Sequence, residues 1–329
     1  MRLQSLTAAL IFASLATTGV ALAGEASPST TDKASPASAV KQEIKLTRVT
    51  PEYWRVTFHN PPYNIYGPQT MPQLNEVVTA IESDPKLVVV VFDSDVPDFF
   101  LTHYDFVPPL TDTTNLPNGP TGLPPLPDML VRLSKAPVVS IVSIRGRATG
   151  VGSELALASD MRFASREKAI LSQWEIGAAL VPGGGPMARL PRLMGRGRAL
   201  EILLTGNDIN GELAERYGYV NRALPDAELD KFVDTMARRI ARFDKQSIAD
   251  IKRLVDAASL PPNDAIAAEW DGFIDSVNRP AAQARIKQLM ELGLQKKSRH
   301  RKTPGPLHRN PGRGVEMIAK ASALHLGRR

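Results

Sequence analysis

Two glutamates in the middle of the chain each lie beside a glycine-rich segment. Glu154 follows Gly150-Val151-Gly152-Ser153, and Glu175 precedes Val181-Pro182-Gly183-Gly184-Gly185. A glycine-rich turn between a strand and a helix lets a ligand approach the bare backbone and directs free N–H groups toward it. Two carboxyl groups that face one ligand can take one proton and supply another. The pattern therefore predicts a ligand site, with Glu154 in the first turn of a helix and Glu175 as the second candidate carboxyl group.

Taken singly, the same residues have ordinary structural interpretations. A glutamate in the first turn of a helix is favoured by the helix dipole, and Glu175 alone would be a solvated side chain. Ser153 lacks the G-x-S-x-G frame of a serine nucleophile, and Gly183–Gly185 lacks the Lys-Ser/Thr that follows a phosphate loop. The absence of cysteine excludes disulfides, thiolate metal sites and a cysteine nucleophile, and no metal site is predicted. Only the combination of both glutamates with both glycine runs favours catalysis.

Strands and a helix at regular spacing are predicted to position these residues. β-Branched and aromatic runs predict strands over 53–58 and 87–92. The near-continuous apolar run 138–144 predicts a strand buried on both faces. Residues 71–83 lie between the first two strands and have apolar side chains at helical spacing, at Met71, Leu74, Val77, Val78 and Ile81. Strand, helix and strand in this order favour stacked βαβ units.

The second half of the chain is predicted to be helical. Before it, segment 108–127 contains seven prolines and two glycines, which predicts an extended loop over or near a site. After Gly195 the pattern is wholly helical. Residues 226–243 have the clearest apolar stripe, with Asp226 available as the N-cap. Further helices are predicted over 247–258, 265–277 and 280–292.

Composition and charge are those of a globular protein with a basic tail. The chain of 329 residues is 43% hydrophobic and 22% charged, which allows one large domain or two small ones. The net charge of +6 is concentrated in 296–329, where ten Lys/Arg stand against the single acid Glu316. The rest of the chain is therefore slightly acidic. This distribution predicts a basic disordered tail and no specific nucleic-acid partner.

The first residues have the pattern of an export signal. Met1-Arg2 precedes the apolar run 6–23, which ends in Ala21-Leu22-Ala23, where small side chains suit signal peptidase. An uncleaved anchor helix is the alternative, since about 18 apolar residues can span a bilayer. We expect a signal peptide over 1–23, a flexible leader over 24–43, an exported protein in the periplasm or medium, and no stable membrane span after cleavage.

The order of short motifs through the chain resembles the crotonase (enoyl-CoA hydratase/isomerase) superfamily. The motifs are G-x-G-x-E-L-A at 150–156, D-x-R-x-A at 160–164, Q-x-E-x-G followed by P-G-G-G at 173–185, R-L-P-R-L-x-G at 189–195 and L-x-T-G at 203–206. Segments 60–64 and 99–105 fit the same family. The resemblance covers roughly residues 44–293, and its specificity lies in the combination.

The resemblance implies an α/β fold, a crotonase-like (ClpP/crotonase) spiral of ββα units with a C-terminal helical region. It divides the chain into a core over 44–195, a helical region over 196–295 and the tail over 296–329. Family members associate through these helices, so the resemblance also implies a homotrimer or hexamer.

The resemblance further implies the roles of site residues. The backbone N–H groups of Tyr104 and Val151 would form an oxyanion hole for an acyl thioester, Glu154 would be the base for the water at C3, and Glu175 would protonate C2. No cofactor is implied, because coenzyme A would be part of the substrate. The residues expected to bind substrate are Thr102, His103, Gly150, Gly152, Trp174, Pro182 and Gly183.

Three residues depart from the family pattern. His103 stands where glycine is usual, Val151 replaces the middle glycine of the usual triple, and Trp174 replaces proline. On residue type alone, His103, Tyr104 and Trp174 are packing or rim residues, although histidine titrates near neutral pH and can carry a proton. Hydration of a 2-enoyl-CoA is the leading function. Isomerisation or hydrolysis of a related acyl compound, or a non-catalytic exported binding protein, are the alternatives.

Overall fold

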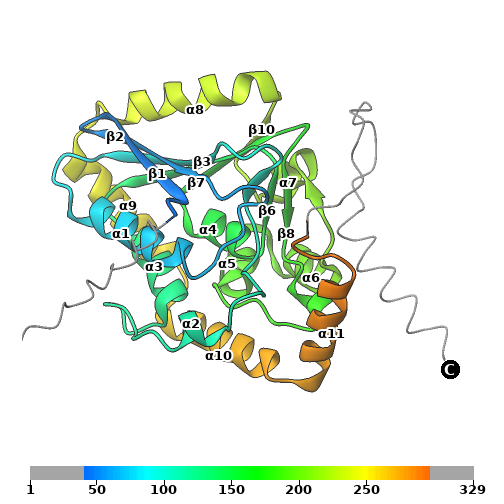
Figure 1. Cartoon of the computed structure of the whole chain (residues 1–329). Helices are drawn as coiled ribbons and strands as arrows, with labels where there is room; N and C mark the ends of the chain where they lie inside the picture. The colour runs from blue at the N-terminus through cyan, green and yellow to red at the C-terminus, as the bar shows by residue number, and fades with distance from the viewer. Residues whose placement is uncertain (1–40, 297–329) are drawn as a thin grey trace, which may run out of the picture. The chain divides into compact units, whose positions relative to one another are not determined.

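The computed structural model describes residues 41–296 (Figure 1). The predicted signal peptide, nearly all of the leader and the tail beyond Lys296 lie outside the described residues. The strands form two sheets. A six-stranded sheet has the order β1-β2-β3-β5-β7-β10, and a four-stranded sheet has the order β4-β6-β8-β9. The helices are α1 (Thr70–Ser83), α2 (Thr111–Thr114), α3 (Pro125–Lys135), α4 (Val151–Ala158), α5 (Pro186–Met194), α6 (Arg196–Thr205), α7 (Gly211–Tyr217), α8 (Asp226–Ile240), α9 (Lys245–Ser259), α10 (Asn263–Val277) and α11 (Pro280–Glu291).

From β3 to β8, consecutive strands belong to different sheets. In chain order the large sheet takes β1 (Ile44–Thr50), β2 (Tyr53–Phe58), β3 (Val89–Ser94), β5 (Val139–Ile144), β7 (Met161–Ser165) and β10 (Arg222–Leu224). The small sheet takes β4 (Phe99–Leu101), β6 (Arg147–Thr149), β8 (Ile170–Ser172) and β9 (Ile209–Asn210). β3–β4, β5–β6 and β7–β8 therefore each contribute one strand to each sheet, and the neighbours β3, β5 and β7 run parallel. The predicted α/β spiral of ββα units is confirmed.

The large sheet is covered on both faces. Val89 and Val91 of β3 pack in one cluster with Leu229 of α8, the helix that lies along the outer face of this sheet in Figure 1. Val90 and Phe92 point the other way, into the main core that contains residues of α1, α3 and α4. Because successive side chains of a strand point to opposite faces, a strand buried on both must be continuously apolar. The same requirement explains the continuous apolar run that forms β5.

The proline-rich segment is less irregular than predicted. It contains α2, and α3 begins inside it with Pro125 at its first position. Proline is tolerated there because the first N–H groups of a helix have no partner within the helix. Leu126, Met129 and Leu130 of α3 are buried in the core. The prediction of an extended loop over 108–127 was therefore wrong where α2 and the start of α3 form.

Two further expectations are corrected after Gly195. This region is helical except for β9 and β10, which complete the edges of the two sheets. Both strands are too short to show a period in the sequence. Asp226 begins α8, but its side chain is not an N-cap. Its carboxylate instead accepts a hydrogen bond of 2.7 Å from Arg145 Nε and pairs with Lys168 at 2.5 Å.

Candidate active site

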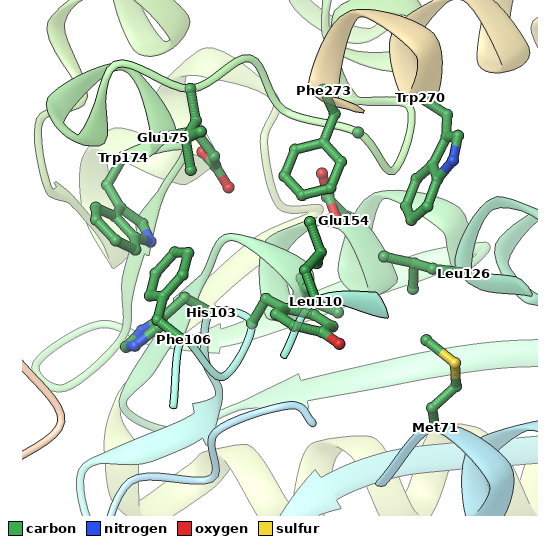
Figure 2. Close-up of a pocket in the computed structure, with 14 residues that line it drawn as sticks. Met71, His103, Phe106, Leu110, Leu126, Glu154, Trp174, Glu175, Trp270 and Phe273 are labelled. Atoms are coloured by element: carbon green, nitrogen blue, oxygen red, sulfur yellow. The ribbon is translucent and has the colours of Figure 1, made fainter. Parts of the chain in front are cut away.

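A small cavity lies between the spiral core and α10, and both predicted glutamates line it. Its volume is about 40 Å³. In Figure 2 the carboxyl groups of Glu154 and Glu175 approach it from different elements. The predicted residues that line the cavity are His103, Tyr104, Val151, Glu154, Trp174, Glu175 and Gly183. The sequence prediction thus brings together residues separated by up to 80 positions.

Glu154 is held rigidly in the first turn of α4. This helix follows β6 directly, and all its residues are buried. Glu154 Oε1 accepts a hydrogen bond of 2.8 Å from the backbone N–H of Gly184. The second glycine run therefore lies against the first glutamate, because a Cβ at Gly184 would lie 2.3 Å from Glu154 Oε2.

Glu175 has fewer partners than Glu154. It begins the 3₁₀ helix η1 (Glu175–Ala178), which follows β8. Its backbone carbonyl accepts a hydrogen bond from Leu180, so the turn after it is fixed. Its carboxyl oxygen Oε2 is buried and has no hydrogen-bond partner in the described structure. A buried polar atom without a partner costs free energy unless a ligand or water satisfies it, so this oxygen is available to a reactant.

The two carboxyl groups have different electrostatic environments. Burial raises the pKa of Glu154 to about 7, while the hydrogen bond from Gly184 and the charge of Arg189 oppose that rise. Burial raises the pKa of Glu175 well above its ordinary value, and the negative charge of Glu154 raises it further. The hydrogen bond from Gly184 and the charge of Arg189 favour ionisation of Glu154 only, so Glu154 is the member of the pair that loses its proton more readily. Such a pair can act as one acid and one base.

Two backbone N–H groups at the cavity have no partner within residues 41–296. Tyr104 forms an isolated parallel bridge with Tyr66, in which the bonds run from Tyr66 N to His103 O and from Asp105 N to Tyr66 O. The N–H of Tyr104 itself is left over and points away from Tyr66. Val151 is the first residue of α4, where the N–H has no acceptor within the helix. Both can donate to an anionic oxygen.

Glycines 150 and 152 serve close packing instead of lining the cavity. Gly150 has φ of +56°, and a Cβ there would lie 3.0 Å from Glu175 Oε1. A Cβ on Gly152 would lie only 1.8 Å from the carbonyl oxygen of Leu101. The Gly152 contact places α4 against β4, and the Gly150 contact places the turn before α4 against Glu175.

Thr102 and Pro182 are also absent from the cavity wall. Thr102 is buried, and its hydroxyl donates to the carbonyl oxygens of Tyr63 at 3.0 Å and Asn64 at 3.2 Å. Its own carbonyl accepts a bond from Gly152. Thr102 thus fixes the segment that leads from β4 to Tyr104. Pro182 immediately precedes Gly183, which lines the cavity.

An aromatic cluster forms one side of the cavity. His103 stacks on Phe106 with centroids 5.9 Å apart, and Trp174 meets the His103 ring edge-on at 5.2 Å. Figure 2 shows the three rings together on the side of Glu175. Burial lowers the pKa of His103 to about 4, so its ring is neutral at physiological pH. The cluster explains the departures at His103 and Trp174 as mutual packing, in agreement with their interpretation from residue type.

Several lining residues were missed from the sequence. Trp270 and Phe273 come from α10, inside a helix that was predicted, and their spacing places both on one face. That aromatic pair was the available signal. Phe106 and Leu110 belong to an irregular segment without such a signal. The missed residues are Met71, Phe106, Leu110, Leu126, Leu180, Trp270 and Phe273.

Residues 41–296 contain neither a cluster of metal-ligating side chains nor a helix suited to span a membrane. No group of three or more His, Asp or Glu side chains among residues 41–296 is arranged to hold a metal ion. In the same range, no helix combines the length and apolarity needed to cross a bilayer.

The fold and the site define an α/β protein of crotonase-like topology with two buried glutamates at one cavity. A family model described as enoyl-CoA hydratase/isomerase matches residues 53–291. The chain belongs to the enoyl-CoA hydratase/isomerase family.

Individual relatives agree with this assignment. The crystal structure of a candidate enoyl-CoA hydratase from Streptomyces avermitilis superposes with a TM-score of 0.74 at 37% identity, covering 85% of this chain and 98% of that one. Crotonyl-CoA hydratase of Syntrophomonas wolfei is 32% identical over 54% of this chain and 67% of its own length. Mouse mitochondrial methylglutaconyl-CoA hydratase is 29% identical over 49% of this chain and 50% of its own. The aligned parts of the curated relatives range from 42% to 67% of their lengths.

Proposed function

We propose that the protein adds water across the double bond of a 2-enoyl-CoA thioester. The observation that carries the proposal is the buried pair Glu154 and Glu175. Burial raises both pKa values, but Gly184 and Arg189 oppose the rise only at Glu154. Hydration also needs fixed hydrogen-bond donors for the enolate oxygen, and the free N–H groups of Tyr104 and Val151 at the same cavity can supply them.

The reaction uses the two carboxyl groups in turn. The thioester oxygen accepts from the N–H groups of Tyr104 and Val151. Ionised Glu154 takes a proton from a water whose oxygen forms the new bond to C3, and the electron pair of the double bond moves toward the thioester oxygen. Protonated Glu175 then gives its proton to C2. Proton transfer to Glu154 and from Glu175 leaves both groups to be reset by a second proton exchange with solvent or product.

The first test is the loss of enoyl-thioester absorbance when the purified chain from Gly24 onward is mixed with crotonyl-CoA. Glu154→Gln and Glu175→Gln are each expected to lower kcat by about 10²- to 10⁴-fold, the usual contribution of an acid or base. Glu215→Gln, at an exposed position of α7, is the matched control and should keep wild-type activity. Lack of turnover by a well-folded wild-type protein would contradict the proposal and favour a non-catalytic binding role.

Product analysis separates hydration from the related reactions. A hydratase yields a 3-hydroxyacyl thioester, an isomerase moves the double bond without gaining water, and a hydrolase releases free coenzyme A. The unpartnered Oε2 of Glu175 beside Glu154 supports hydration, because a water held there would have two carboxyl groups around it.

Export and self-association are further parts of the proposal. The apolar run 6–23 with its Ala21-Leu22-Ala23 end supports export, and N-terminal sequencing of protein from fractionated cells should find Gly24 first. A mature chain that keeps Met1 and stays with the cytosol would contradict it. The exposed apolar residues Ile251, Leu254 and Val255 of α9 support a homo-oligomer.

A further inference from the structure

Two opposite charges are buried behind Glu154, outside the cavity wall. Arg189 of α5 is 4% exposed and Glu269 of α10 is 6% exposed. Neither side chain lines the cavity. Buried charges are costly and persist where they are paired and hydrogen-bonded. Their contacts therefore indicate what they hold in place.

Gly184 connects Arg189 to Glu154. The N–H of Gly184 donates to Glu154 Oε1 at 2.8 Å, while the carbonyl of Gly184 accepts from Arg189 Nη1, also at 2.8 Å. A Cβ on Gly184 would lie 2.3 Å from Glu154 Oε2, and a Cβ on Gly185 would lie 2.1 Å from Arg189 Nη1. The glycine run thus lets a carboxylate and a guanidinium approach the same stretch of backbone.

Glu269 holds the helix that carries Arg189. Its two carboxyl oxygens accept from the backbone N–H groups of Met187 at 3.0 Å and Ala188 at 2.5 Å, in the first turn of α5. A carboxylate at a helix N-terminus is favoured by the unpaired N–H groups and the helix dipole. Glu154 and Glu269 therefore bind neighbouring backbone N–H groups, one at Gly184 and the other in the first turn of the helix that carries Arg189.

We propose that Arg189 is a positioning residue that holds Glu154 through Gly184, and that Glu269, by competing for the charge of Arg189, sets how readily Glu154 ionises. The inference deepens the proposed hydration and rests on it only for the catalytic meaning of Glu154. The contacts themselves are independent of the reaction.

The groups that act on Glu154 come from several elements. Arg189 lowers the pKa of Glu154, against the larger effect of burial. Burial brings the pKa of Arg189 to about 10, so the guanidinium remains charged at neutral pH. Burial, opposed by the bonds from Met187 and Ala188, raises the pKa of Glu269 to about 7, and Glu154 raises it further. Glu175 of η1, Tyr66 and Tyr219 also interact with Glu154, and the tyrosines stay neutral because burial raises their pKa.

The test is an infrared titration of the Glu154 carboxyl, whose C=O stretch is assigned by its absence in Glu154→Gln. Arg189→Met removes the cation, and the titration midpoint should rise by about one pH unit, as expected when an opposite charge is lost nearby. Glu269→Gln is isosteric and removes the competing anion, so the midpoint should fall. Arg189→Lys should return it toward the wild type. Arg192→Met, on the exposed face of the same helix, is the control without a shift.

Titration midpoints of Glu154 that shift in opposite directions in Arg189→Met and Glu269→Gln support the inference. A general loosening of the packing around Glu154 would shift both midpoints in the same direction. Unchanged midpoints, or shifts of the same sign, overturn it. If Arg189→Met does not fold, the downward shift in Glu269→Gln alone decides. The titration needs no substrate, so it remains decisive even if crotonyl-CoA is not turned over. Where turnover is present, the acid limb of kcat/KM should move with the infrared midpoint.

Discussion

Burial destabilises the ionised form of Glu154, so the stability of the fold depends on the protonation of this side chain. Its pKa rises from 4.5 to about 7 because of burial, so the folded state binds this proton more tightly than the unfolded chain. The stabilisation from this bound proton is complete at pH values below the pKa of Glu154 in the unfolded chain. It is lost as the pH rises through about 7. A rise of this size corresponds to on the order of 3 kcal/mol.

Glu154→Gln should therefore gain stability relative to wild type as the pH increases, while losing activity. Between about pH 4 and about pH 8, the difference in unfolding free energy should move toward the variant by up to about 3 kcal/mol. Urea unfolding at both pH values measures it, and Glu215→Gln is the control. A constant difference across this range would show that Glu154 ionises in the folded protein as freely as in the unfolded chain.

The two raised pKa values also predict the shape of the activity profile. The proposed hydration needs an ionised Glu154 and a protonated Glu175. Turnover should therefore rise through about pH 7 and fall again at higher pH, where Glu175 loses its proton. The dependence of kcat/KM on pH is the measurement. A profile that is already flat well below pH 7 would contradict the assignment of Glu154 as the base.

Gly152 is a residue whose replacement should disturb the oxyanion donors. Its Cβ would lie 1.8 Å from Leu101 O, so Gly152→Ala must move α4 away from β4. We expect a loss of about 1–3 kcal/mol of stability and a larger loss of kcat than of substrate affinity, since Val151 N–H leaves its place. Gly197→Ala on α6, where a Cβ meets nothing within 4 Å, is the matched control. Equal effects of both substitutions on activity would contradict this role.

In the proposed reaction, the loop after β4 and η1 would together limit the size of the acyl group. The cavity of about 40 Å³ is far smaller than the roughly 150 Å³ that holds a benzene ring in an apolar protein core. Phe106, which contacts both His103 and Trp174, closes one side. Short-chain 2-enoyl thioesters should therefore be preferred over aryl ones.

Phe106→Ala should broaden that preference. Removing the ring opens space beside Glu175, so kcat/KM for cinnamoyl-CoA should rise relative to crotonyl-CoA by about tenfold or more, the scale of a few apolar groups in a pocket. Val107→Ala, at the next position but 70% exposed, is the control. An unchanged ratio would place the acyl group elsewhere in the cavity.

The elements also show what could be predicted from sequence. Residues 53–58 form β2 as expected, and 71–83 lie within α1, because each segment repeats one periodicity over its whole length. The pairing of Glu154 with Glu175 was predictable because each glutamate adjoins a glycine run. Arg189 and Glu269 were not, since a charged residue in an amphipathic helix gives no sign that it will be buried. Helix α3 was hidden by its prolines, and β9 and β10 by their shortness, so tertiary pairing decided all three.

Helix α9 exposes a row of large apolar side chains. Ile251, Leu254 and Val255 are 63%, 62% and 56% exposed, and their spacing places them on one face of the helix. Lys252 lies on another face and pairs with Asp160 at 2.6 Å, which fixes the rotation of the helix. A contiguous exposed apolar stripe is more typical of an interface than of a free surface.

We propose that a second copy of the chain covers this stripe. Because the family resemblance implies a trimer or hexamer, light scattering should give a mass of three or six subunits. Leu254→Lys should then lower the mass, because a charge buried in an interface without a partner is strongly unfavourable. Leu204→Lys, at a position of α6 that is 63% exposed, provides a matched control for the charge itself. Dissociation by Leu254→Lys alone would assign the interface to α9. A monomeric wild type would contradict the oligomer, while dissociation by Leu204→Lys alone would move the interface to α6.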